Sequence, residues 1–152
     1  DFFYLWESQD MAILPWSPLA GGLLTGKFNP EAEQKADEDA RLNSASYGPA
    51  MLAEHRIKIA EGLVELANTM GCTPSQLALA WLLHRPAGTV IPILGARKLE
   101  QFTDNMGCLD IELNLTQIEA LDELAPPSVA YPASLFKTDF YRMMMHGENA
   151  ID

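Results

Sequence analysis

The sequence predicts an α/β fold in which short buried strands alternate with amphipathic helices. Two apolar runs, residues 11–14 and 89–94, are followed by glycine and then a basic residue. Helical patterns lie between and after them, which gives the order strand, helix, helix, strand, helix, helix. Continuous hydrophobicity is typical of strands covered on both faces, so we expect the two strands to be parallel.

The first strand, residues 11–14, leads into the sequence Pro-Trp-Ser-Pro. Pro18 cannot donate a hydrogen bond to a neighbouring strand, so the strand is expected to end by Ser17. Two adjacent glycines follow, and glycine lets a backbone pass close to a ligand while its free N–H groups suit an anion. The alternative is a strand and a tight turn with Trp16 in the core, because glycine-rich turns are common.

The next two elements are predicted to be helices. Residues 51–70 have one apolar face, and Gly71 stands where a C-terminal glycine cap belongs. A second helix follows an N-cap at Thr73, with a capping box to Gln76, and it is expected to end before Pro86.

The second strand, residues 89–94, repeats the plan of the first. It is followed by Gly95 and Arg97, and Pro92 inside it marks a bulge or the end of the strand. Two consecutive strands that each end in a glycine and a cation form a paired anion site. The last two loops of a (β/α)₈ barrel commonly build a phosphate site of this kind.

Two further helices complete the pattern. Residues 98–106 are predicted to be a short helix closed by Gly107. Thr116 and Glu119 form a capping box for the last helix, which stops before Pro126.

The stretches WSPLAGGLLTGKF (residues 16–28) and IPILGARKLEQFTDNMG (91–107) resemble the aldo-keto reductase family, near the seventh and eighth strands of its barrel. The resemblance covers about residues 11–125. It implies that the chain is the C-terminal part of a (β/α)₈ TIM barrel, about strands seven and eight with their helices. It also implies one partial domain, residues 1–152, in which the tail 128–152 shapes the substrate pocket.

The resemblance further implies a site for the dinucleotide NADP(H). Trp16 matches an aromatic side chain that stacks on the nicotinamide ring, a contact that contributes on the order of 1 kcal/mol beyond area burial. The other matching positions in the two loops are Ser17, Pro18, Leu19, Ala20, Gly21, Lys27, Gly95, Arg97, Gln101, Asp104 and Asn105.

The types of these residues suit such a ligand. Arg97 can pair with a 2′-phosphate in a bidentate manner, which favours NADPH over NADH. Gln101 and Asn105 lie four residues apart and so share a helix face, where the resemblance implies contacts with the adenosine. The family more often has Glu where this chain has Asp104. Taken singly, these side chains are ordinary exposed polar residues, so their joint occurrence carries the prediction.

The acidic segment 28–47 contains one arginine, Arg41. By composition the segment is a solvated loop. The family's loop after the seventh strand folds over the cofactor and often supplies an arginine, so the resemblance implies that Arg41 binds the cofactor.

The resemblance implies that the parent enzyme reduces aldehydes or ketones to alcohols by transfer of a hydride from NADPH. The family's catalytic Tyr, Lys, Asp and His come from earlier strands, and we find no catalytic residue here. We therefore expect this chain to supply the cofactor-binding half and to lack reductase activity alone. The alternatives are a non-catalytic NADP(H)-binding or regulatory subunit, and an inactive truncated half-barrel.

The composition and the net charge exclude some classes of binding partner. The chain has 152 residues and a net charge of −11, which argues against nucleic acid or an anionic membrane as a partner. A small carbonyl compound is the expected substrate, and open strand edges favour a homo-oligomer. Two cysteines without a CxxC motif, and no signal-like segment, predict reduced thiols in a cytoplasmic protein. Because the chain starts at Asp1, we expect it to be a fragment.

Overall fold

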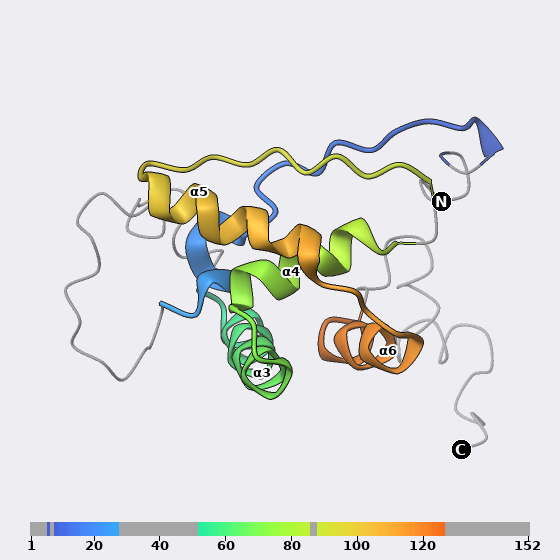
Figure 1. The fold of residues 1–152 in the computed structure, drawn as a ribbon. Helices are drawn as coiled ribbons and strands as arrows, with labels where there is room; N and C mark the ends of the chain where they lie inside the picture. The colour runs from blue at the N-terminus through green and yellow to red at the C-terminus, as the bar shows by residue number, and fades with distance from the viewer. Residues whose placement is uncertain (1–5, 7, 28–51, 86–87, 127–152) are drawn as a thin grey trace, which may run out of the picture.

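The computed structural model describes residues 6, 8–27, 52–85 and 88–126, which form helices beside two extended segments. In order, the elements are the 3-10 helix η1 (Ala20–Thr25), α3 (Glu54–Met70), α4 (Pro74–Leu83), α5 (Leu99–Met106), the 3-10 helix η3 (Gly107–Asp110) and α6 (Leu115–Leu124). Figure 1 shows the extended segments along one side, α4 and α5 next to them, and α3 and α6 beyond. Helix α4 contacts η1, α3, α5 and η3, so it lies at the centre of the described residues.

A pair of parallel extended segments replaces the two expected strands. Isolated bridges join Ile13 to Val90 and Trp16 to Ile93 in one register. The N–H of Ile91 donates to the carbonyl of Ile13 at 2.8 Å. Within the described ranges these bridges do not form a continuous strand, so the prediction of two strands is wrong in that respect, whereas the parallel pairing is present.

Proline explains why the pairing is interrupted. The carbonyl of Pro15 accepts from the N–H of Ile93 at 3.0 Å, but Pro15 has no N–H to return to the neighbouring segment. Pro92 likewise cannot donate on the opposite edge. The segments are therefore extended and parallel without a regular ladder, and the larger half-barrel stays a prediction.

The paired segments have an exposed apolar face. Residues opposite each other in a sheet share a face, and successive residues alternate between faces. Leu14 is 57% exposed and Trp16 71%, while their partners Ile91 and Ile93 are 51% and 48% exposed. The exposed face is therefore made of large apolar side chains, and we call these four residues the open apolar face.

Helix α3 ends as the sequence predicts but begins later. It starts at Glu54, because the preceding Ala53 has an extended backbone with ψ of 140°. Gly71 has φ of 72°, the left-handed conformation of a glycine C-cap, and the next N–H, of Cys72, donates to the carbonyl of Ala67 at 3.1 Å. The C-terminal cap is therefore confirmed.

Helix α4 has the predicted capping box. The Thr73 hydroxyl accepts from the N–H of Gln76 at 3.2 Å, and the Gln76 side-chain oxygen accepts from the N–H of Thr73 at 3.1 Å. The helix ends at Leu83, before Pro86. Around it lies the main core, whose buried members are Leu63, Ala67, Leu77, Ala78, Leu79, Ala80, Cys108, Leu113 and Leu121.

Polar contacts fasten the end of α4 to α6. The Arg85 guanidinium binds both oxygens of Asp122, at 2.8 and 2.9 Å. The indole N–H of Trp81 donates to the same carboxylate at 2.8 Å, and Arg85 lies 4.5 Å from the centre of the Trp81 ring. These contacts fix the orientation of α6 against the core.

Gly107 is the C-cap of α5, as predicted, and with φ of −61° it continues the chain into η3 without a left-handed turn. The predicted cap of the last helix, in contrast, is wrong. The last helix is capped by Asn114, whose side chain accepts from the N–H of Gln117 at 2.9 Å, and it starts at Leu115. The cap therefore lies two positions before the predicted cap at Thr116.

Helix α5 turns its polar side toward the molecule. Asn105 is its buried residue, at 5% exposed, and Gln101 and Asp104 are half-buried. Its outward side carries Leu99, 78% exposed, and Phe102, 50% exposed. With Met106 and Leu109, which are also exposed, they form the outer apolar stripe.

Among the described residues no helix combines the length and the apolarity that a membrane crossing requires.

Candidate functional site

The residues of interest gather where the two parallel segments end. Both segments run in the same direction, so Trp16 and Gly95 are followed by loops at the same end of the pair (Figure 1). One loop leads into η1, and the other leads into α5. Trp16 is among the most exposed large side chains of the described chain, so the alternative that it is a core residue is wrong.

The loop after Trp16 has an unusual backbone. Ser17 has φ of 54° and Ala20 of 50°, and the glycines that follow have φ of 69° and 109°. Left-handed conformations are strained for residues with a Cβ, and such runs turn successive N–H groups toward one side. The N–H of Ala20 donates to Ser17 and that of Gly22 to Leu19, both at 2.9 Å.

The neighbouring N–H groups of this loop have no backbone acceptor in the described residues. They belong to Leu19 and Gly21, two of the predicted phosphate contacts. Pro18, the residue between Ser17 and Leu19, is half-buried. The loop therefore keeps donors that an anion could use, in a backbone fixed by its own turns.

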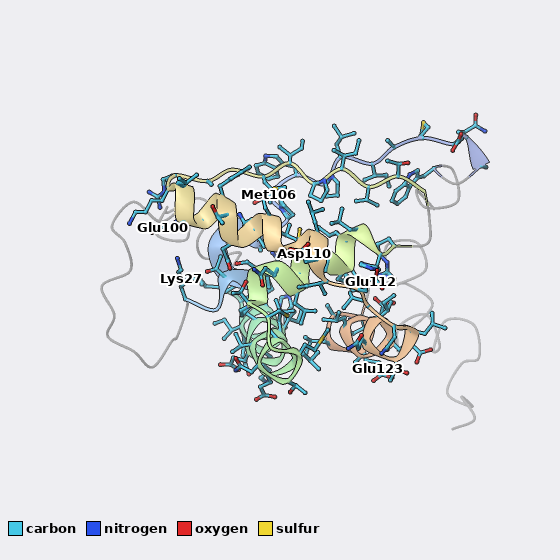
Figure 2. The ribbon with its side chains drawn as sticks, in the orientation of Figure 1. Lys27, Glu100, Met106, Asp110, Glu112 and Glu123 are labelled. Atoms are coloured by element: carbon cyan, nitrogen blue, oxygen red, sulfur yellow. The ribbon has the colours of Figure 1, made fainter. Side chains whose placement is uncertain are left out.

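Lys27 follows this loop at the same end of the molecule. It is exposed, and Figure 2 shows it on the side of the view where α5 begins. The preceding Gly26 has φ of 72°, and a Cβ there would lie 2.9 Å from the Pro74 ring. Glycine is thus required for the chain to pass the start of α4. Arg41 lies outside the described residues.

The second loop contains a glycine that the fold itself does not require. Among the described residues, its two chain neighbours apart, no atom lies within 4 Å of the position that a Cβ on Gly95 would occupy, and its φ is not in the left-handed region. The close approach of a ligand is the remaining physical reason for glycine at this position. Arg97, two residues later, is exposed.

Gln101 holds this loop from the first turn of α5. Its side-chain oxygen accepts from the N–H of Arg97 at 3.0 Å and from the N–H of Lys98 at 3.3 Å. These bonds satisfy backbone donors at the start of α5, where the side chain of the N-cap residue, Lys98, makes no capping hydrogen bond. The Gln101 oxygen is therefore occupied within the protein, and its amino group is the part that could contact a ligand.

Asp104 binds the start of α4. One oxygen accepts from the Thr73 hydroxyl at 3.2 Å, and the other accepts from the Gln76 amide nitrogen at 3.2 Å. The same nitrogen donates to the Asp104 carbonyl at 2.9 Å. The sequence predicts Thr73 and Gln76 as a capping box but not their bonds to α5. The available signal is that a capping box uses the oxygen of Gln76 and leaves its amide nitrogen free to donate.

Asn105 is buried beside these groups. The residue is 5% exposed, and its side-chain oxygen and nitrogen are not among the fully buried atoms that lack a hydrogen-bond partner in the described residues. With the free donors of the first loop and the space at Gly95, it fits a site that is completed by a polar ligand such as a dinucleotide.

The described residues contain no group of His, Cys, Asp and Glu that could hold a metal ion. His55 is exposed on α3, and both nitrogens of His84 are engaged, one with the Ala80 carbonyl at 2.8 Å and the other with the Leu113 N–H at 3.4 Å. The four tyrosines and His146 lie outside the described residues.

The two cysteines are free thiols in this structure. Burial raises the pKa of both Cys72 and Cys108 above the ordinary value of a thiol. Both therefore stay protonated at neutral pH and are poor nucleophiles.

Three comparisons bear on this site. The sequence profile described as "Aldo/keto reductase family" matches residues 1–126. A protein of Arabidopsis thaliana named "Probable voltage-gated potassium channel subunit beta" is 32% identical over 124 residues, which are 82% of this chain and 37% of that protein. A "Probable aryl-alcohol dehydrogenase" of Saccharomyces cerevisiae is 31% identical over 130 residues, 85% of this chain and 38% of that protein.

A solved structure is also similar to this chain. The glycerol dehydrogenase of Gluconobacter oxydans superposes with a TM-score of 0.64 at 25% sequence identity, covering 86% of this chain and 40% of that chain. This chain thus spans about two-fifths of the length of each of these three proteins.

Proposed function

The chain belongs to the aldo/keto reductase family, and we propose that it is the cofactor-binding part of an NADP(H)-dependent oxidoreductase that reduces aldehydes or ketones. The observation that carries this proposal is the meeting of two loops at one end of the parallel pair. One holds the exposed Trp16 and free backbone donors, and the other holds Gly95, Arg97 and Gln101.

Each part of a dinucleotide has a matching group in this proposal. The Trp16 ring stacks on the nicotinamide, and the loop from Ser17 to Gly21 together with Lys27 binds the pyrophosphate. Arg97 pairs with the 2′-phosphate, and the amides of Gln101 and Asn105 bind the adenosine. When bound, NADPH supplies the hydride, and the proton for the substrate oxygen comes from residues outside the described part.

The open apolar face supports the larger proposal of a half-barrel. Leu14, Trp16, Ile91 and Ile93 present large apolar side chains on a pair of segments that has no third neighbour in the described ranges. Exposed patches of this kind mark surfaces that another element covers. We propose that further strands of an aldo-keto reductase barrel cover this face, which agrees with the share of the relatives that the chain spans.

The proposal is tested by nucleotide binding to the 152-residue chain. Titration with NADPH, followed by the quenching of tryptophan fluorescence, should give saturable binding that is at least tenfold tighter than that of NADH. Arg97→Gln should remove this preference, because the glutamine lacks the charge that pairs with the 2′-phosphate. Lys58→Gln is the matched control, since it removes one positive charge from the exposed surface of α3. Equal affinities for both nucleotides in the unaltered chain would contradict the proposal.

A second candidate is a non-catalytic NADP(H)-binding subunit. It is favoured by the relative that is named as a potassium channel subunit beta. Both candidates predict that the 152-residue chain binds nucleotide and that, alone, it shows no carbonyl-dependent oxidation of NADPH. They differ for the complete protein, where reduction of an aromatic aldehyde supports the oxidoreductase and its absence supports the subunit.

A further inference from the structure

The bonds between α4 and α5 form a closed cluster of three side chains. Thr73 and Gln76 form the capping box of α4 with each other, and both also donate to the Asp104 carboxylate. The Gln76 amide nitrogen additionally donates to the Asp104 carbonyl. The cluster therefore fixes both the side chain and the backbone of α5 at this point.

The cluster is continuous with the nucleotide loop. Gln101 precedes Asp104 by three residues, so the two side chains share one face of α5. Gln101 accepts from the backbone of Arg97 and of Lys98. A displacement of this face would remove the acceptor from both N–H groups and release the loop.

Packing leaves little room for another arrangement. A Cβ on Gly107, at the end of α5, would collide with the side-chain amide of Gln76. Glycine at this position lets η3 approach α4 closely enough for Gln76 to reach Asp104. Its φ of −61° is open to any residue, so space and not backbone conformation requires glycine.

The capping box of α6 shows that these additional bonds are not needed to start a helix. Asn114 and Gln117 exchange the same two bonds, each at 2.9 Å. Neither makes a described side-chain bond to another helix. Within one chain there are thus two capping boxes, of which one only caps and the other also binds α5.

We propose that Thr73, Gln76 and Asp104 form a positioning cluster that docks α5 on α4 and so holds Arg97 and Lys98 in place for the nucleotide. This inference rests on the proposed NADP(H) site, and it makes Asp104 a positioning residue in place of the cofactor contact that the sequence predicts. None of the three side chains touches the ligand in this account.

The decisive variant is Gln76→Glu, compared with Gln117→Glu. Glutamate at this position of a capping box keeps the cap, so both helices still start correctly. At position 76, however, the carboxylate cannot donate to Asp104 and repels it. We expect Gln76→Glu to weaken NADPH binding about tenfold and to reduce the preference for NADPH over NADH, whereas Gln117→Glu should leave both unchanged.

A double variant separates position from charge. Gln76→Glu with Asp104→Asn has the same net charge as the unaltered chain, and the asparagine amide can donate to Glu at position 76. It should recover at least half of the lost preference for NADPH. If the added negative charge alone weakened binding, Asp104→Asn by itself should instead strengthen it.

A readout without ligand completes the test. Hydrogen exchange of the Arg97 and Lys98 amides should be faster in Gln76→Glu than in Gln117→Glu, because Gln101 no longer stays within reach of them. Equal exchange rates in the two variants would overturn the positioning role even if the chain binds NADPH. Failure of the unaltered chain to bind either nucleotide would instead refute the proposed function, and the ligand-directed part of the inference with it.

Discussion

Helices α4 and α5 lie against each other but are held by different forces. Helix α4 buries Leu77, Leu79 and the alanines between and after them, and its surroundings are the apolar core. Helix α5 buries an asparagine and directs its polar side inward, while the outer apolar stripe remains exposed. One helix is stabilised by burial of apolar surface and the other chiefly by hydrogen bonds.

This difference indicates which parts of the chain are complete. The core around α4 is closed within the described residues, because α3, η3 and α6 all contribute to it. The outer apolar stripe and the open apolar face have no cover there. An amphipathic helix normally turns its apolar side toward protein. The exposed stripe therefore marks the part of the fold that depends on further chain or on a partner.

The largest expected effect comes from truncating a core side chain of α4. Leu79→Ala should lower the free energy of unfolding by about 3 kcal/mol, since Leu79 is fully buried and the cavity adds to the lost transfer energy. Leu99→Ala on α5 is the control and should change it by less than about 0.5 kcal/mol. Urea unfolding followed by circular dichroism measures both. A similar loss in the two variants would show that the stripe is buried in solution.

Smaller effects on the free energy of unfolding are expected where α5 contacts α4. Gly107→Ala should cost about 1–3 kcal/mol, because the added methyl group collides with Gln76 and forces it off Asp104. Gly95→Ala should leave the free energy of unfolding unchanged within about 0.5 kcal/mol, since its Cβ meets no atom.

The Gly95→Ala variant also separates stability from binding. Gly95→Ala should weaken NADPH binding although it is neutral for folding, because the methyl group occupies the space left for the ligand. Nucleotide titration beside urea unfolding checks this. Unchanged affinity in Gly95→Ala would show that no ligand approaches this position.

A still smaller effect on folding is expected for the outer apolar stripe itself. Phe102→Ser combined with Leu109→Ser should change the free energy of unfolding by less than about 1 kcal/mol, because both side chains are at least half exposed. The variant should nevertheless self-associate less at high concentration, since exposed apolar patches promote association. Sedimentation velocity measures the self-association, and unchanged association would indicate that the chains associate through the open apolar face.

The features that the sequence predicts correctly are those that depend on residues close together in the chain. The Thr73 capping box, the Gly71 cap and the stop before Pro86 depend on neighbouring residues, and all are confirmed. The helix start at Asn114 was missed because Thr116 offers an equally good motif two residues later. The apolar runs predict continuous strands that are interrupted at Pro92, but Pro15 also lacks the N–H that a regular ladder needs.

The site shows the limit of such patterns. Sequence spacing places Gln101 and Asn105 on one helix face, but it cannot say that the oxygen of Gln101 is used by the Arg97 loop. Nor can it show that Asp104 turns toward Thr73 and Gln76, about thirty residues earlier in the chain. Contacts between segments far apart in sequence decide these roles, and the inward polar side of α5 follows from them.

The smallest expected effect is a pH dependence of the free energy of unfolding, which arises from the thiols that flank α4 and α5. Cys72 precedes α4 and Cys108 follows α5, and burial raises the pKa of both in the folded chain. In the unfolded chain a thiol ionises near about pH 8.5. Above that pH the folded state binds more protons than the unfolded state, so the free energy of unfolding falls as the pH rises, whereas below it the contribution of the thiols is constant.

Urea unfolding between pH 7.5 and 10 should therefore show a steeper decline of the free energy of unfolding in the unaltered chain than in a variant with both cysteines changed to alanine. Because lysines and tyrosines also titrate toward pH 10, only the difference between the two slopes reports on the thiols. Parallel slopes would mean that both thiols reach water and ionise in the folded state, and that the core around α4 is less tightly closed than its burial indicates.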